Sequence, residues 1–150
     1  MRARWKGSAA ALALTLLLPL AGCGESQIDR YCHAVEGYRT ELADMVDSSS
    51  ATALLSHRPM LHDLASQAPE DLTDEWQTFL AAVDGLQEAL DRAGVKASAF
   101  SGGKPPAGMS AAARKAVADA ADQLRSDDVV LAANGIEQQG RDVCKVNFGL

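Results

Sequence analysis

The chain has 150 residues, with 14 Lys and Arg side chains against 20 Asp and Glu, a formal net charge of −6. A chain of this length forms one ordinary domain and buries roughly two-thirds of the surface that it exposes when unfolded. The acidic balance argues against nucleic-acid binding, which needs clustered Lys and Arg. It also argues against a domain that lies flat on an anionic membrane.

The N-terminal segment is organised like a secretion signal. A basic start is followed by an apolar stretch from Ala9 to Leu18 and by a small-residue exit that ends at Cys23. The apolar stretch is shorter than the roughly 20 residues that a membrane-spanning helix needs. Because no Arg-Arg pair precedes this stretch, we expect the general secretory route rather than twin-arginine export.

Residues 20–23 read Leu-Ala-Gly-Cys, which resembles the cleavage motif of bacterial lipoproteins. The resemblance implies that residues 1–22 are removed and that a diacylglyceryl group on the Cys23 thiol anchors the mature domain to the extracytoplasmic face of the cell membrane. The alternatives are a plain transmembrane anchor and an ordinary cleaved signal, which would leave Cys23 as a free exported thiol. Without the signal, 11 basic side chains face 20 acidic ones, a formal charge of −9.

The mature chain is expected to begin with a very short tether. Residues 23–26 are the lipidated cysteine and this tether, and residues 27–150 form a single helical domain. The three residues after Cys23 reach about 10 Å at most when extended. The domain is therefore expected to sit close to the bilayer surface.

Cysteine parity agrees with lipidation of Cys23. An exported protein with three cysteines leaves one unpaired, and lipidation of Cys23 leaves Cys32 and Cys144 as one pair in an oxidising compartment. A disulfide between them would close almost the whole domain and stabilise it by about 4 to 5 kcal/mol in the chain-entropy model. The alternatives are two buried free thiols or a metal site that includes His33.

Apolar residues at helical spacing predict helices in the first half of the domain. One helix is expected from about Ile28 to Met45, with Ser26 as its N-cap and Ser48–Ser50 after its end. A weaker helical stretch follows, broken or kinked at Pro59. After a turn at residues 68–71, the clearest helix runs from Thr73 to Ala93 and stops at Gly94.

The second half contains a long loop and two more helices. Residues 95–108 carry Gly-Gly and Pro-Pro pairs and form a loop that is either functional or loose. Ser110 caps an Ala-rich helix, and Ser126 opens a last helix. The apolar face of the last helix is expected to contain Val130, Ala133, Ile136, Gly140 and Cys144.

These elements predict an all-α fold. It is a helical bundle of four long helices and a short Pro-broken helical segment, closed by the Cys32–Cys144 disulfide. The disulfide would join the start of the first long helix to the end of the last, so we expect those two helices to run antiparallel.

Few residues have the pattern of a catalytic or metal site. His57, Met60 and His62 have ligand chemistry, but the two histidines are five residues apart rather than four, so one helix face would not present both. We therefore favour exposed histidines and a core methionine. Residues 101–104 spell Ser-x-x-Lys, but they lie in the Gly-Pro loop without the partner motifs of a serine acyl-enzyme.

The carboxylates of the expected helices are also ordinary. Asp84, Glu88 and Asp91 lie away from the apolar stripe, and Glu88 can pair with Arg92 at i+4. Glu137 and Arg141 repeat this spacing. A solvated helix face explains these residues, so we expect neither an enzyme nor a cofactor.

Two aromatic residues have separate expected roles. Trp76 belongs to the apolar stripe of its helix, and a domain with so few aromatics is a poor candidate for polysaccharide binding. Phe100, in the long loop, has no obvious helical face. We expect it to anchor the loop on the bundle, the alternative being a contact with a partner.

Three short segments are similar to a known group of proteins. They are Tyr31-Cys32, the Ala68-Pro69-Glu70 turn before a Trp-containing helix, and Val143-Cys144-Lys145-Val146-Asn147. On these segments the mature part resembles the small Ala-rich helical lipoproteins of high-GC Gram-positive (actinobacterial) bacteria, which are catalogued without a function. The resemblance implies an all-helical fold with one disulfide and supplies no catalytic residues.

The favoured function is a non-enzymatic envelope module that contacts another protein at the membrane surface. The alternative is a carrier of a small or apolar ligand within the helical bundle. An exposed apolar patch beside the Val95–Gly108 loop would favour the partner module, and an apolar cavity among the helices would favour the carrier.

Overall fold

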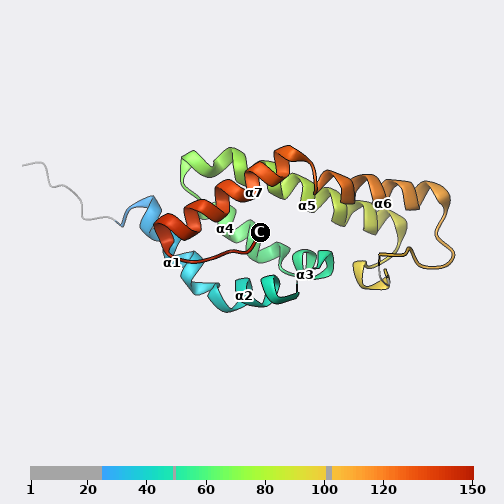
Figure 1. Cartoon of the computed structure of the whole chain (residues 1–150), viewed down its shortest axis with the longest axis horizontal. Helices are drawn as coiled ribbons and strands as arrows, with labels where there is room; N and C mark the ends of the chain where they lie inside the picture. Colours follow the sequence, from blue (N-terminus) through green and yellow to red (C-terminus); the bar gives the residue numbers. More distant parts are fainter. Residues whose placement is uncertain (1–24, 49, 101–102) are drawn as a thin grey trace, which may run out of the picture.

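The computed structural model describes residues 25–48, 50–100 and 103–150. The expected signal peptide and Cys23 lie outside this part of the chain. The described residues form seven α-helices and no strand, which confirms the all-α prediction (Figure 1).

The first predicted helix is two helices in the structure. Helix α1 spans Gln27–Gly37 and α2 spans Arg39–Ser48. Ser26 caps α1 as expected, because its Oγ accepts the Asp29 N–H at 3.0 Å while Asp29 accepts the Ser26 N–H in return. The prediction of one uninterrupted helix is wrong, because the helix is broken at Tyr38, whose backbone has φ −98° and ψ 13°. Gly37, a poor helix former, precedes it, and the Tyr38 hydroxyl donates to Asp63 at 3.0 Å.

The Pro-broken segment also divides into two helices. Helix α3 spans Ala51–Ser56 and α4 spans Arg58–Gln67. The break lies at His57, two residues before Pro59, because proline fits the first turn of a helix, where its missing N–H has no partner to lose. A 3-10 turn, η1, at Glu70–Leu72 leads into α5, Thr73–Ala93. The bounds of α5 and its left-handed cap at Gly94, φ 66°, are as predicted.

The last two helices begin where the sequence predicts. Helix α6 spans Ala111–Gln123, and Ser110 Oγ accepts the Ala113 N–H at 3.1 Å. Helix α7 spans Asp127–Gln139 and continues as a π-helical turn, η3, at Gly140–Cys144.

The expected apolar face of α7 is partly wrong. Val129, Ala132 and Ile136 are buried, whereas Val130 is 46% exposed. Three apolar residues in a row, 129–131, fit more than one helical face, and packing selected the face that begins one residue earlier.

Helix α5 is the central element of the fold. It packs against α6 and α7, while α1 packs against α4 and against η3 (Figure 1). Helix α1 reaches the last helix at η3, the turn that continues α7 and carries Cys144.

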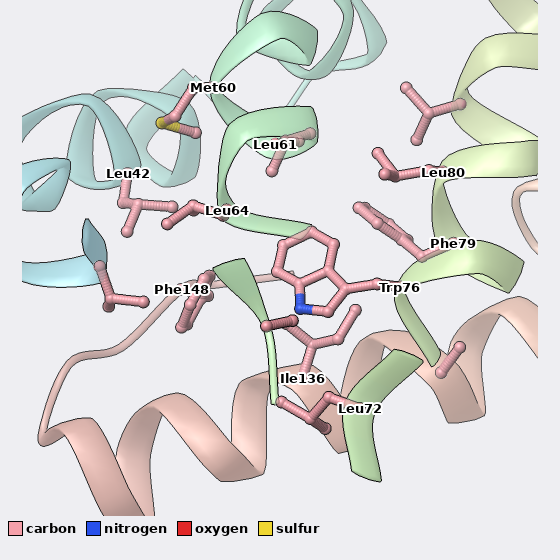
Figure 2. Close-up of a cluster of buried hydrophobic side chains, with 14 of the residues drawn as sticks. Leu42, Met60, Leu61, Leu64, Leu72, Trp76, Phe79, Leu80, Ile136 and Phe148 are labelled. Atoms are coloured by element: carbon pink, nitrogen blue, oxygen red, sulfur yellow. The ribbon is translucent and has the colours of Figure 1, made fainter. Parts of the chain in front are cut away.

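The main core surrounds Trp76, which is 1% exposed (Figure 2). Its Nε1–H donates to the Tyr31 hydroxyl at 3.2 Å, and its ring meets Phe79 and Phe148 edge-on at 6.3 Å. Burial raises the pKa of Tyr31 to about 12, although the hydrogen bond from Trp76 acts in the opposite direction. The Tyr31 hydroxyl therefore stays neutral and keeps its partner at any physiological pH. The expected place of Trp76 in the apolar stripe is confirmed.

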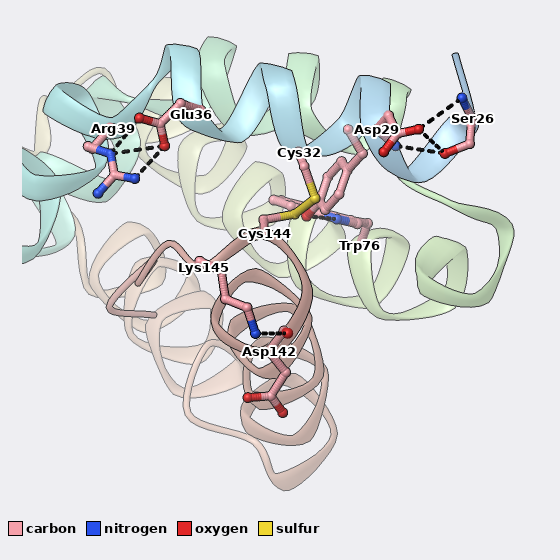
Figure 3. Close-up of a disulfide and its surroundings, with 10 residues drawn as sticks. Ser26, Asp29, Cys32, Glu36, Arg39, Trp76, Asp142, Cys144 and Lys145 are labelled. Atoms are coloured by element: carbon pink, nitrogen blue, oxygen red, sulfur yellow. Dashed lines mark hydrogen bonds and ion pairs between the residues drawn. A yellow bond between two sulfur atoms is a disulfide. The ribbon is translucent and has the colours of Figure 1, made fainter. Parts of the chain in front are cut away.

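The disulfide between Cys32 and Cys144 is confirmed, with an S–S distance of 2.05 Å and a Cα–Cα distance of 4.9 Å (Figure 3). It joins the middle of α1 to the end of η3 across 112 residues of sequence. The side chain of His33, the residue next to Cys32, lies 3.2 Å from the Glu25 carboxylate, measured from Nε2 to Oε1.

The C-terminal residues return to the core after the disulfide. Phe148 is fully buried, and its ring occupies the place where a Cβ on Gly140 would lie. Glu137 accepts the Gly149 N–H at 2.7 Å and the Arg141 guanidinium at 3.3 Å. The Glu137–Arg141 pair exists, but the prediction of a solvated Glu137 is wrong, because this side chain is buried under the C-terminal residues that it binds.

Candidate binding groove

Two adjoining hollows lie between α3, α5 and α6. Their volumes are about 340 and 300 Å³, and both are lined by Ala51, Leu86, Ala121 and Arg125. Because they share these residues, we treat them as one groove with an outer and an inner part. The volume of each part is near the lower end of the range of about 300 to 1,000 Å³ for small-molecule sites.

The outer part of the groove lies next to the long loop. Its walls include Leu90, Phe100, Pro105, Val117 and Ala118. Phe100 is half-buried and packs on the small cluster of Leu86, Ala89, Leu90 and Val117, which confirms that it anchors the loop on the bundle. The loop is thus a wall of the groove over the residues that the structure describes.

The inner part of the groove points toward the main core. Its apolar walls are Met45, Leu54, Phe79, Leu124 and Leu150. Leu150 belongs to the C-terminal segment that Glu137 holds, with its N–H 3.4 Å from the carboxylate. The C-terminal residues therefore close one end of the groove.

The Ala-rich sequence of α6 explains why space remains there. Arg114, Ala118 and Ala121 lie at positions i, i+4 and i+7 of α6, which share one helix face, and Arg125 lies two residues beyond the end of this helix. The two alanines leave room between α6 and α3 that longer side chains would fill. One arginine lies on each side of the two alanines along the chain.

Charged side chains are few along the groove, and all are at its rim. They are Arg114, Asp122 and Arg125. Arg125 is 3.1 Å from Asp122 in an exposed i, i+3 pair. Arg114 is exposed and has no ion pair among the described residues. The rim of the groove thus has an excess positive charge on a strongly acidic domain.

The outer part of the groove is far from the N-terminal end of the domain. Gln27, at the start of α1, donates from Nε2 to the Ala68 carbonyl at 3.0 Å, so α1 begins near the start of α5. Leu86 and Leu90 lie near the other end of α5. The distance along this helix from Thr73 to Leu90 is about 25 Å. In Figure 1 the start of α1 lies toward one end of the long axis, whereas α6 lies toward the other end and the C-terminus near the middle.

The predicted metal-ligand candidates do not converge. His57 Nδ1 is 2.9 Å from the Ala53 carbonyl of its own helix, Met60 is 7% exposed in the main core, and His62 is exposed beside Asp84. Among the residues that can be described, no group of three or more His, Cys, Asp or Glu is placed to hold a metal ion. The Ser-x-x-Lys sequence begins at Ser101, which lies outside the described residues.

Asp84 forms a tertiary contact that the sequence reading missed. Its Oδ1 lies 2.7 Å from Arg58 Nη1 and 3.0 Å from His62 Nε2, both on α4. Partial burial raises the pKa of Asp84, but the hydrogen bonds and charges of His62 and Arg58 outweigh it, so the pKa is below its ordinary value. Asp84 therefore fastens α4 to α5, rather than lying on a free solvated face. The expected pair of Glu88 with Arg92 is present at 2.6 Å.

The groove arginines were also missed. Their only signal in the sequence is that Arg114 and Arg125 lie on either side of the Ala-rich stretch that contains Ala118 and Ala121. That signal is weak, because arginines on an exposed helix face are common.

Comparison of the chain with protein-family models, with curated proteins and with solved structures found no match. Within the described ranges, the helices are all too short or too polar to cross a membrane.

Proposed function

We propose that this protein is a lipid-anchored, non-enzymatic binding protein on the extracytoplasmic face of the cell membrane, and that it takes up an apolar ligand in the groove. The anchor rests on the likeness of residues 20–23 to a lipoprotein cleavage motif and on the cysteine parity that leaves Cys23 outside the disulfide. The ligand rests on the groove.

The apolar groove between α3, α5 and α6 is the observation that carries this proposal. Both hollows have mainly apolar walls and are open to solvent. Burial of apolar ligand surface there is favourable by about 25 cal/mol per Å² removed from water. The polar side chains at the rim are arginines and one carboxylate, which suit recognition rather than proton transfer.

A separate surface favours the second candidate, an envelope module that contacts another protein. Val130 and Leu131 on α7 are 46% and 67% exposed, and they lie next to each other on the surface. Asp127 begins the same stripe one turn earlier. Exposed apolar patches that are rimmed by polar residues mark protein–protein interaction sites. This surface and the groove involve different helix faces, so the two functions are compatible.

The ligand proposal is tested by blocking the groove. Ala121 lines both parts, so Ala121→Phe should fill the space that they share and abolish the fluorescence increase of the neutral dye Nile red. The matched control is Ala116→Phe, an exposed position on the opposite side of α6 from Ala118. Equal dye binding by the two variants, both folded by circular dichroism, would refute the groove as the binding site.

The anchor is tested by Cys23→Ala. We expect the variant to leave the membrane fraction or to be sorted wrongly, while the intact protein extracted from its membrane carries lipid mass on Cys23 by mass spectrometry. Membrane retention of the variant at the level of the wild type would contradict lipid anchoring.

The partner surface is tested by a photo-crosslinking amino acid at position 131 in intact cells, with position 116 as an exposed control on α6. A discrete adduct from position 131 and none from position 116 would support a docked partner. The same adduct pattern from both positions would contradict it.

A further inference from the structure

The groove has a composition that selects one class of ligand. We propose that it binds a single-chain amphiphile with an anionic head group, with the chain on the apolar walls and the head at the Arg114 end of the rim. This inference rests on the proposed ligand-binding function and adds the chemistry of the ligand.

The walls fit an apolar chain rather than a polar or branched ligand. Leu86 is common to both parts of the groove, and Phe79 and Leu90 extend the apolar surface on either side along α5. The lining residues of the outer part within α6 run from Arg114 to Asp122, a length of about 12 Å. A mainly apolar space of this kind accommodates a flexible chain, and each buried CH₂ group contributes about 0.8 kcal/mol.

The charges at the rim determine the head group. Arg114 has no ion pair within the described ranges, whereas Arg125 is partly neutralised by Asp122 at 3.1 Å. The rest of the mature domain is strongly acidic, so its overall field repels anions and cannot by itself attract them. A carboxylate or phosphate bound here would therefore depend on the two arginines, whose planar guanidinium groups suit both anions.

The outer part of the groove, where the head group would bind, lies away from the end of the domain that carries the expected tether. This tether of three residues reaches about 10 Å, whereas Phe79, Leu86 and Leu90, the α5 residues that line the groove, lie about 9, 20 and 25 Å along this helix from the end where α1 starts. The ligand that we infer is a monomeric amphiphile from the surrounding medium rather than the protein's own lipid.

The experiment is a displacement assay with the purified whole protein and Nile red. Four competitors share a dodecyl chain and differ in the head group: laurate, dodecyl phosphate, dodecyl maltoside and dodecyltrimethylammonium, each below its micelle concentration. We expect the two anionic amphiphiles to displace the dye at roughly 10-fold lower concentration than the cationic one. Preference for laurate or for dodecyl phosphate then identifies a carboxylate or a phosphate head.

Arginine variants connect this preference to the rim. Arg114→Gln should reduce the preference for anionic over cationic competitors by roughly 5-fold and leave displacement by dodecyl maltoside unchanged. Arg92→Gln is the control, because Arg92 is exposed, pairs with Glu88 and lies outside the groove. Equal displacement by all four amphiphiles, or an unchanged preference in Arg114→Gln, would overturn the anionic head group. Loss of Nile red binding in Ala121→Phe would still support the groove, so the two proposals fail separately.

Discussion

Gly140→Ala tests how the C-terminal residues complete the core. Gly140 lies at the start of η3 with φ −55° and ψ −49°, a backbone that any residue adopts. In an ordinary helix this substitution stabilises by about 1 kcal/mol, because alanine is the better helix former. Here an added Cβ would lie 2.2 and 2.3 Å from two ring atoms of Phe148 and 3.1 Å from the Val146 carbonyl oxygen. The structure therefore reverses the sign of the expected effect.

The size of the destabilisation depends on whether the Phe148 ring can move away from the added Cβ. Phe148 is fully buried against Trp76, so its ring cannot shift by the required distance within the packed core. Overpacking in a core costs about 1 to 3 kcal/mol, and complete loss of a buried Phe costs about 3 to 5 kcal/mol. We expect Gly140→Ala to lower the free energy of unfolding by about 2 to 4 kcal/mol.

Urea unfolding followed by far-UV circular dichroism measures this change, and a double-mutant cycle assigns it. If the clash with Phe148 is the cause, Gly140→Ala should cost nothing in a Phe148→Ala background. Gly85→Ala is the control, since nothing lies within 4 Å of a Cβ at this position in α5. Gly140→Ala with the stability of the wild type or higher would refute the close packing of Phe148 on η3.

Two further predictions concern stability. Cys32→Ser should lower the free energy of unfolding by about 4 to 5 kcal/mol in the chain-entropy model, and a reducing agent should destabilise the wild type but not the variant; an unchanged melting temperature, with Cys144 still alkylatable in the wild type, would contradict the disulfide. Because the pKa of Asp84 is below its ordinary value of 3.8, its contact with Arg58 and His62 stabilises the fold above that pH and is lost as the pH falls through the lowered pKa. Melting curves from pH 7 to about pH 2 should therefore show Asp84→Asn less stable than the wild type at pH 7 and equal to it at the acidic end; a difference that does not depend on pH would contradict this account.

Local features of the sequence predicted most helix boundaries. Ser26, Ser110 and Ser126 each precede a helix, and Gly94 ends α5, because caps act within one turn of the chain. The pairs of Glu88 with Arg92 and of Glu137 with Arg141 were predictable for the same reason. The spacing of residues within one helix can be read directly from the sequence.

Boundaries that depend on other helices were not predictable. The break at Tyr38 involves the hydroxyl bond to Asp63 on α4, and the break at His57 lies before Pro59 rather than at it. The three consecutive apolar residues 129–131 fit two different buried faces of α7. The packing of α7 against α5 decided between them, and Val129 is buried. In each case the deciding contact joins residues that are far apart in the sequence.

The sequence by itself determined the all-α class, the central helix and the pairing of Cys32 with Cys144, since each depends on local periodicity or on cysteine parity. Only the tertiary structure decided where space remains. The groove exists because the small side chains of α6 face α3 and α5, and Glu137 is buried because the C-terminal residues fold back over it. Both results depend on which surfaces meet, and the spacing of residues along one helix does not contain that information.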